Sequence, residues 1–283
     1  MTTPAGTQRP QTAALDPPTK RQTIRRIVTF VVLTCALSSV GWAATIISSE
    51  TSILLLFAPG LAALITRVAF DRNLRGFGWK LPAPRYALAA YLLPAVVSGS
   101  MFVLAWLVAG YYSADSTDTD VVRGFVMTAT VGVVVVAAFS IGEEVGWRGF
   151  LVPELAKVTT FTNVALISGG IWAVWHWPLI LFAADVTDFD ATPVWFAIPA
   201  FTVTIMAAGT VLAWLTLRSG SIWPAVILHG SQNAITQNFF GEYTTDTGNS
   251  AYYVSEVGGL IALAWLVAAY VFWRNRHLVT CSS

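Results

Sequence analysis

Two adjacent carboxylates lie at the end of a long apolar run in the stretch VVVVAAFSIGEEVGWRGF, where Glu143 and Glu144 are followed by Arg148. A charged side chain in a bilayer costs about 2.5 to 3.5 kcal/mol on insertion scales, so such residues usually face a protein interior or a watery cavity. Positions i and i+4 of a helix share one face, which predicts a pair between Glu144 and Arg148 if the helix continues through Gly146. Glu143 then has no cation of its own and is a candidate general base that activates water.

Two further apolar stretches carry histidines. The stretch ISGGIWAVWH contains Trp172 and ends on His176, and VILHGSQNAI contains His229 and Asn233. In each stretch the two residues are four positions apart, so they lie on one face of a helix. Imidazole and carboxamide groups can move a proton or donate hydrogen bonds to an oxyanion. A structural alternative stays open for each group: the charged pair could simply cap a span, and His176 could bond a neighbouring helix.

The composition is that of a membrane protein. Of the 283 residues, 55% are hydrophobic and 11% are charged, and the mean hydropathy is +0.65, values that do not suit a water-facing surface. The formal net charge is +1, and no basic cluster is interleaved with aromatic residues, so nucleic acid is not an expected partner. The two cysteines, Cys35 and Cys281, have no paired spacing and are expected to be free thiols.

Apolar runs of roughly 20 residues, the length that crosses the hydrocarbon core, occur about eight times. The sequence therefore predicts an all-α, polytopic integral membrane helical bundle with about eight transmembrane helices. The expected spans are about 27–47, 52–70, 86–110, 122–142, 163–184, 194–217, 222–240 and 256–273. The segment GFLVPELAKVTTF, between the fourth and fifth spans, is too short and mixed to cross and is expected to lie along the membrane interface.

The distribution of cations predicts the orientation. With the N-terminus in the cytoplasm and eight alternating spans, every Lys and Arg except Arg123 falls on the cytoplasmic side, as the positive-inside rule requires. The protein is thus expected in the cell membrane with both termini cytoplasmic and with a cytoplasm-facing active site. His229 lies about two helical turns into its span, at the depth of Glu143, whereas His176 is expected to lie deeper.

The three patterns resemble the motif set of the CPBP family of intramembrane proteases, which includes Ras-converting CAAX endopeptidases and bacteriocin-processing or self-immunity proteins. The residues that carry the resemblance are Glu143, Glu144 and Arg148, Trp172 and His176, and His229 and Asn233. Trp172 stands where many members have phenylalanine, a conservative aromatic change. Trp172, Trp175 and Trp177 are expected to anchor packing and the membrane interface rather than take part in chemistry.

The resemblance implies an intramembrane endopeptidase that hydrolyses peptide bonds of membrane-associated substrates. Glu143 would take the proton from water with the help of His176, while His229 and Asn233 would donate to the oxyanion. Prenylated CAAX-type proteins and bacteriocin-like peptides are two substrate classes between which the spacing does not choose. Arg148 would hold its neighbouring carboxylate, and through it the position of the base.

A zinc-dependent version of this chemistry stays open. Glu143, His176 and His229 would supply three zinc ligands and leave a fourth position for water. The sequence contains no H-E-x-x-H, so the protein is not a zincin. The same residues also provide enough acids, bases and donors for hydrolysis without metal.

The chain is expected to divide into a disordered cytoplasmic tail (1–22), a transmembrane domain (23–275) with a protease-like core at about 122–240, and a second cytoplasmic tail (276–283). Expected partners are the lipid bilayer and a peptide or lipidated protein substrate; the sequence does not indicate an oligomeric state. A non-catalytic scaffold or bacteriocin self-immunity protein could keep the same residues. A transporter would spread ionisable groups through the whole depth of the membrane, which the outer halves of these spans do not show.

Overall fold

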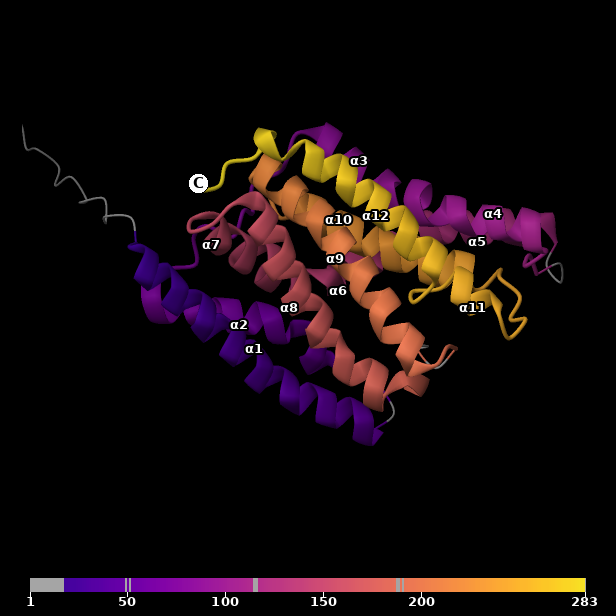
Figure 1. Ribbon diagram of the computed structural model, residues 1–283, viewed down its shortest axis with the longest axis horizontal. Coiled ribbons are helices and arrows are strands. Elements are labelled where there is room, and N and C mark those ends of the chain that lie inside the picture. The colour runs from indigo at the N-terminus through magenta and orange to yellow at the C-terminus, as the bar shows by residue number, and fades with distance from the viewer. Residues whose placement is uncertain are drawn as a thin grey trace, which may run out of the picture.

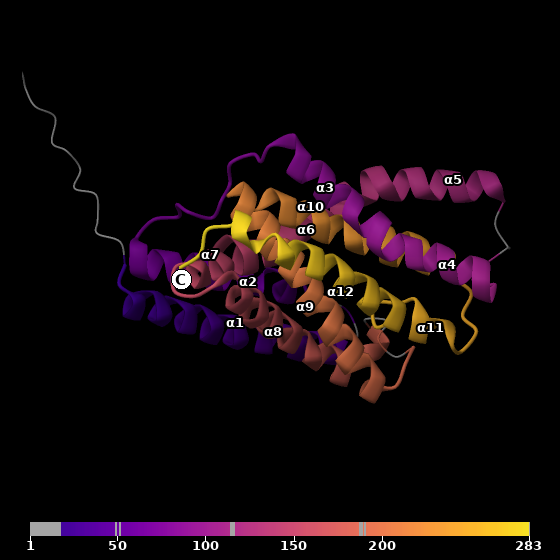
Figure 2. The same ribbon diagram turned by 45° about the horizontal axis from the view of Figure 1, so that its top comes forward.

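Helices make up almost all of the described chain. A computed structural model describes residues 18–48, 50, 52–113, 117–186, 189 and 191–282. Within these residues no strand forms, and extended backbone pairs at one antiparallel bridge, between Tyr112 and Thr244. The helices lie side by side in an elongated bundle (Figures 1 and 2). The predicted polytopic helical membrane bundle is confirmed.

In the described residues, six helical runs are long and apolar enough to cross a membrane. They are α1 (Lys20–Ser48), α2 (Ile53–Asp71), α3 to α4 (Pro84–Ala109), α5 to α7 (Thr119–Ala156), α8 (Phe161–Phe182) and α9 (Val194–Ser219). The seventh predicted span corresponds to α10 (Trp223–Ser231), which continues into the π-helix η5 (Gln232–Gly241), and the eighth to the shorter helix α12 (Gly259–Arg274). A short helix, α11 (Ser250–Tyr253), precedes α12. The predicted count of eight is therefore approximate.

The two predicted tails differ in how far the structure describes them. Residues 1–17 of the predicted N-terminal tail lie outside the described residues, and α1 already begins at Lys20. The C-terminal tail folds back on the bundle, because the backbone N–H of Ser282 donates to the carbonyl of Ala156 at 2.8 Å. Figure 1 shows the C-terminus next to α7 at one end of the bundle and α11 at the other end.

The fourth span is longer than predicted. After α6 (Val133–Gly146), the π-helix η3 (Trp147–Leu151) and α7 (Val152–Ala156) continue the same helix. Pro153 has no N–H to give to an α-helical turn, and the wider π-helical turn before it accommodates that loss. Phe150 and Leu155 are buried. The segment GFLVPELAKVTTF thus continues the helix of the fourth span and packs its apolar side chains inside the protein; its place along the membrane interface stays a prediction.

A buried network of charges ties the end of this long helix to the first two helices. Arg67 of α2 contacts Asp71 at 2.9 Å and the fully buried Glu154 of α7 at 3.3 Å. Arg26 of α1 also pairs with Asp71, and Lys157 pairs with Glu154 at 2.5 Å. Removing one partner from a buried pair leaves a charge uncompensated. The network therefore holds α1, α2 and α7 at fixed positions relative to one another.

Helices α2 and α6 approach closely because two glycines of α6 face the backbone of α2. A Cβ atom on Gly142 would lie 2.6 Å from the carbonyl oxygen of Leu56, and one on Gly146 would lie 2.6 Å from the carbonyl of Pro59. Small residues allow helix backbones to come this close in membranes. Since the two glycines flank the adjacent carboxylates of α6, this crossing sets where both carboxylates lie.

Gly146→Ala is expected to lower the unfolding temperature in detergent. Alanine improves helix propensity by about 1 kcal/mol, but overpacking costs about 1 to 3 kcal/mol. The overpacking term dominates because the contacted atoms belong to backbone that cannot rotate away. The matched control is Gly170→Ala on α8, where a Cβ atom meets nothing within 4 Å and no loss is expected. An unchanged Tm for Gly146→Ala would contradict the close crossing.

Candidate active site

One cavity brings the predicted motifs together. It measures about 940 Å³ and lies among α8, α9, η5 and α12. Trp172 and His176 from α8, His229 from α10 and Asn233 from η5 all line it. The adjacent carboxylates of α6 lie directly behind this lining, in contact with Trp172 and His229. The three sequence motifs therefore converge on one site.

Glu144 is the centre of a buried charge cluster. Its Oε1 accepts a hydrogen bond from Arg148 Nη1 at 2.8 Å and lies 2.9 Å from Nδ1 of His229. Since a carboxylate oxygen accepts, Nδ1 of His229 donates, which leaves Nε2 of the ring for other contacts. The guanidinium of Arg148 also lies over the ring of Trp172, 4.0 Å from its centroid. The predicted pair between Glu144 and Arg148 is confirmed, and the bond to His229 is an addition.

Glu143 has a different environment and no ion pair with a described cation, as predicted. Its Oε2 accepts hydrogen bonds from the indole N–H groups of Trp172 at 3.0 Å and Trp147 at 3.3 Å. The side chain is 6% exposed. Oε1 takes part in neither bond. Two neutral donors therefore orient this carboxylate without neutralising its charge.

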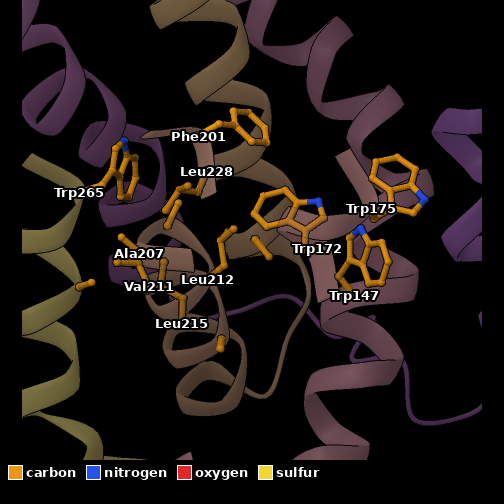
Figure 3. Close-up of a cluster of buried hydrophobic side chains, with 14 of the residues drawn as sticks. Trp147, Trp172, Trp175, Phe201, Ala207, Val211, Leu212, Leu215, Leu228 and Trp265 are labelled. Atoms are coloured by element: carbon orange, nitrogen blue, oxygen red, sulfur yellow. The ribbon is translucent and has the colours of Figure 1, made fainter. Parts of the chain in front are cut away.

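The tryptophans beside Glu143 have a larger part in the site than predicted. Trp172, expected only to anchor packing, contacts the candidate base directly. Trp147, which the motif analysis did not single out, follows Glu143 by four residues, so their shared helix face was the available signal. Trp175 donates instead to Ser38 of α1 at 2.7 Å. Figure 3 shows Trp147, Trp172 and Trp175 next to one another beside the aliphatic core.

His176 is held in one tautomer when its ring is neutral. Its Nδ1 lies 2.9 Å from the carbonyl oxygen of Trp172, and because a carbonyl accepts, Nδ1 carries the proton and Nε2 keeps its lone pair. The ring packs edge-on against Trp175 and Phe201. Since Trp172, one turn earlier, reaches Glu143, His176 is one turn further along α8 and still lines the same cavity.

Asn233 is the one motif residue whose side chain makes no hydrogen bond to a described residue. It is partly buried, lines the cavity and lies in the π-helix η5. Arg148 lies in the other π-helix at the site, η3. Turns of this kind occur frequently at functional sites, because the wider turn re-aims side chains. The amide of Asn233 is therefore available to a bound ligand.

The predicted zinc ligands are not assembled into a metal site. Among the described residues, no group of three or more His, Cys, Asp and Glu side chains is placed to hold a metal ion. One oxygen of Glu143 is taken by two indole donors, and His229 turns one ring nitrogen toward Glu144. The set Glu143, His176 and His229 would need to rearrange to bind zinc with a ligating geometry.

The exposed part of the cavity lining lies at the end of the bundle away from the C-terminal tail and α7. Near the motif residues its lining is closed, with Leu212 and Leu228 each 1% exposed. Five of its described lining residues are exposed: Ala191 before α9, and Asn238, Gly241, Glu242 and Asp246 at the end of η5 and in the loop that follows. This loop was predicted to lie outside the cytoplasm.

Comparisons with known proteins find a match to the segment that carries these motif residues. Residues 121–235 match the family described as Type II CAAX prenyl endopeptidase Rce1-like. This segment of the chain is similar to that family. All motif residues, from Glu143 to Asn233, fall inside the matched segment, so the resemblance predicted from them is confirmed. We refer to residues 121–235 as the Rce1-like core.

A curated relative supports the same family. The chain is 29% identical over 90 residues to the "CAAX prenyl protease 2" of Methanococcus maripaludis. The alignment covers 31% of this chain and 32% of that protein. The chain thus spans about a third of the length of the curated relative it matches.

Proposed function

We propose that this protein is an intramembrane endopeptidase that hydrolyses peptide bonds of membrane-associated substrates with water activated by Glu143. One observation carries the proposal: a carboxylate without a counter-ion lies behind a cavity that presents His176, His229 and Asn233, all within the Rce1-like core. The name of the curated relative makes prenylated CAAX-type proteins the first substrate class to test. Bacteriocin-like peptides are the second class.

Activation of water is the task of Glu143. The indoles of Trp147 and Trp172 fix Oε2, so Oε1 accepts the proton from a water molecule in the cavity. Because the two indole donors are neutral, they position the carboxylate and leave its charge available for the proton. Arg148 does not form an ion pair with Glu143, since its guanidinium is bonded to Glu144.

Stabilisation of the oxyanion falls to His229 and Asn233. Glu144 accepts from Nδ1 of His229 and stabilises the imidazolium form, whose Nε2–H then donates into the cavity. The free amide of Asn233 supplies a second donor. Preorganised donors of this kind need no rearrangement as negative charge develops on the substrate carbonyl.

Protonation of the leaving amine falls to His176. Its Nδ1 is committed to the carbonyl of Trp172, so proton transfer takes place at Nε2. A proton taken from water by Glu143 passes to this nitrogen and then to the amine as the peptide bond breaks. Both groups return to their starting protonation states at the end of the reaction.

Cleavage of a membrane-peptide panel by the purified protein tests the proposal. The panel includes a prenylated CAAX reporter, its unprenylated counterpart and hydrophobic bacteriocin-like peptides, and products are identified by mass spectrometry. Cleavage of at least one class at a defined bond is expected. A folded, thermally stable protein that cleaves no member of the panel would contradict the proposal and favour a scaffold.

Asn233→Ala is expected to lower kcat by about 10²- to 10³-fold with little change in KM, as loss of one oxyanion donor typically does. The reason is that its amide contacts the substrate oxygen only when negative charge develops there. Steady-state kinetics on a cleaved reporter provide the measurement. The control is Asn163→Ala in the first turn of α8, which is exposed and should leave both constants unchanged. A loss confined to KM would show that Asn233 binds the substrate ground state.

A further inference from the structure

A chain of hydrogen bonds behind the cavity wall ends on Gln232. The indole N–H of Trp265 in α12 donates to Oγ of Ser98 at 3.0 Å, and the Ser98 hydroxyl donates to Oε1 of Gln232 at 3.1 Å. Ser98 lies in the π-helix η1 (Ala95–Gly99), and Gln232 is the first residue of η5. We call these three residues the relay. The relay joins three helical segments that lie far apart in the sequence.

The relay runs in one direction. An indole N–H can only donate, so Oγ of Ser98 accepts from Trp265 and gives its own proton to Oε1 of Gln232. The amide nitrogen of Gln232 then offers two N–H donors and no acceptor. Ser98 and Trp265 are both 0% exposed, so water does not compete for these bonds. The orientation of the Gln232 amide is therefore fixed.

The fixed amide belongs to the wall of the active-site cavity. Gln232 is partly buried and lines the cavity together with His229 and Asn233. Positions i, i+3 and i+4 lie on one side of a helix. Nε2 of Gln232 makes no hydrogen bond to a described residue, and the protein does not enclose this atom as it encloses Oε2 of Glu144. Two oriented N–H donors are thus available to a molecule in the cavity.

We propose that Gln232 binds the substrate, and that its amide N–H groups donate to a backbone carbonyl oxygen of the peptide close to the bond that is cut. Ser98 and Trp265 are positioning residues that hold this amide. The proposal rests on the proposed proteolytic function. A carbonyl is the expected ligand because the amide of Gln232 offers donors alone, and every peptide carries carbonyl acceptors whatever its sequence.

The carbonyl bound by Gln232 differs from the one that reacts. His229 and Asn233 supply the donors for the reacting carbonyl, and Gln232 lies within one helical turn of both, about 5.4 Å along the helix. An extended peptide rises about 3.3 Å per residue, so Gln232 contacts a carbonyl within two residues of the cut bond. The charge of that carbonyl does not change during the reaction. Its hydrogen bond therefore stabilises the bound substrate and the transition state equally.

The relay makes this hydrogen bond effective. Immobilising a free glutamine side chain costs about as much free energy as one hydrogen bond contributes. The relay immobilises Gln232 when the protein folds, so this cost does not recur when the substrate binds. Gln237 also lines the cavity, but no such chain of bonds holds its amide. Gln237→Met is therefore the matched control for Gln232→Met.

Peptide binding to a protein that lacks the base tests the proposal without any need for proteolysis. The background is Glu143→Gln, and the probes are the prenylated CAAX reporter and a hydrophobic bacteriocin-like peptide, each with a fluorescent label, followed by anisotropy in detergent. Gln232→Met should raise Kd about 3- to 10-fold, the effect of losing one hydrogen bond, and Gln237→Met should leave Kd unchanged. An unchanged Kd in Gln232→Met, or no binding of either probe to the background, would overturn the proposal.

Thioamide substitution in the peptide identifies the carbonyl. Sulfur accepts hydrogen bonds more weakly than oxygen, so replacing one backbone C=O at a time by C=S should raise Kd at the position that contacts Gln232. The same replacement should have no effect on Kd in Gln232→Met, because the donor is absent. A purely structural role of Gln232 would not couple it to one atom of the peptide. If no position is sensitive, or if the effect persists in Gln232→Met, the assignment is refuted.

Ser98→Ala tests the relay. This variant keeps the amide of Gln232 but removes its anchor, so Kd should rise, and adding Gln232→Met should raise Kd little beyond the single Gln232 variant. A lower Tm with unchanged Kd in Ser98→Ala would contradict the positioning role. The combined variant also removes the hydroxyl that Gln232→Met leaves without an acceptor, so it replaces Gln232→Met if that protein does not fold.

Cleavage kinetics separate this proposal from the proposed function. With Glu143 present, Gln232→Met should raise KM and leave kcat unchanged, the reverse of the expectation for Asn233→Ala. A fall in kcat alone would place the amide at the oxyanion and overturn its role in binding. If no peptide is cleaved while the Kd values respond as expected, the proposed function fails and the role of Gln232 stands. Cleavage with an unchanged KM in Gln232→Met would leave the function standing and remove the role of Gln232.

Discussion

Glu143→Gln is expected to lower kcat by about 10²- to 10⁴-fold, the usual contribution of a general base, while the fold is retained. Glutamine has the shape of glutamate, and its carbonyl oxygen can still accept from the indoles of Trp147 and Trp172. It cannot take a proton from water. The change also removes a buried charge that has no counter-ion, so Tm should be unchanged or higher. Cleavage rates and thermal unfolding of the same preparations give both readings.

A matched control separates the role of this carboxylate from the chemistry of the substitution. Glu50→Gln makes the same change at an exposed residue between α1 and α2 and should leave kcat and Tm as in the wild type. If Glu143→Gln cleaves at the rate of the wild type, then Glu143 is not the base. If it cleaves nothing and is clearly less stable, Glu143 is structural and the scaffold interpretation gains support.

Arg148→Ala is expected to destabilise the protein by about 3 to 5 kcal/mol, the cost of breaking a buried ion pair. Loss of Arg148 leaves the charge of Glu144 without compensation, because this carboxylate has no contact with solvent. Its second oxygen, Oε2, makes no hydrogen bond to any described residue. With the guanidinium gone, His229 is its one remaining described partner. Thermal and denaturant unfolding in detergent should show the loss, together with loss of cleavage.

A second substitution decides whether uncompensated charge is the cause. In Arg148→Leu combined with Glu144→Gln, the uncompensated charge of residue 144 is absent. Most of the stability lost in Arg148→Ala should therefore return. Cleavage should not return, since the His229 imidazolium would no longer be stabilised. A double variant as unstable as Arg148→Ala would show that packing of the guanidinium against Trp172, and not its charge, supports the fold.

Much of the architecture and part of the site could be predicted because they depend on local spacing. Hydropathy runs located the spans, and the i, i+4 rule predicted the bond between Glu144 and Arg148. The bond between Glu144 and His229 was out of reach, because it depends on how α6 and α10 cross. Likewise, a tryptophan in an apolar run predicts only packing. The N–H of Trp172 points at Glu143 because α8 lies close to α6, which the sequence does not show.

Two other features depend on packing between helices, which the sequence does not show. The segment GFLVPELAKVTTF was too short and mixed to be predicted as a span, but it continues the fourth helix through a π-helical turn, and Arg67 of another helix pairs with its Glu154. The cation bias located the charged end of the bundle, and the opening of the site was expected there. The exposed part of the cavity lining lies instead mainly at the end of η5 and in the loop that follows.

The buried network of charges in α1, α2 and α7 has a consequence for how the chain assembles as it is synthesised. The hairpin of α1 and α2 emerges before α7, and it carries Asp71 beside Arg26 and Arg67. An early hairpin can therefore enter the bilayer with part of its charge already neutralised from within. Glu154 is synthesised later, and its burial becomes favourable because Arg67 is already in the membrane and can pair with it. The order of synthesis thus matches the order in which these charged residues form their ion pairs. A ribosome-bound intermediate that ends after α2 should therefore already be a stably inserted hairpin.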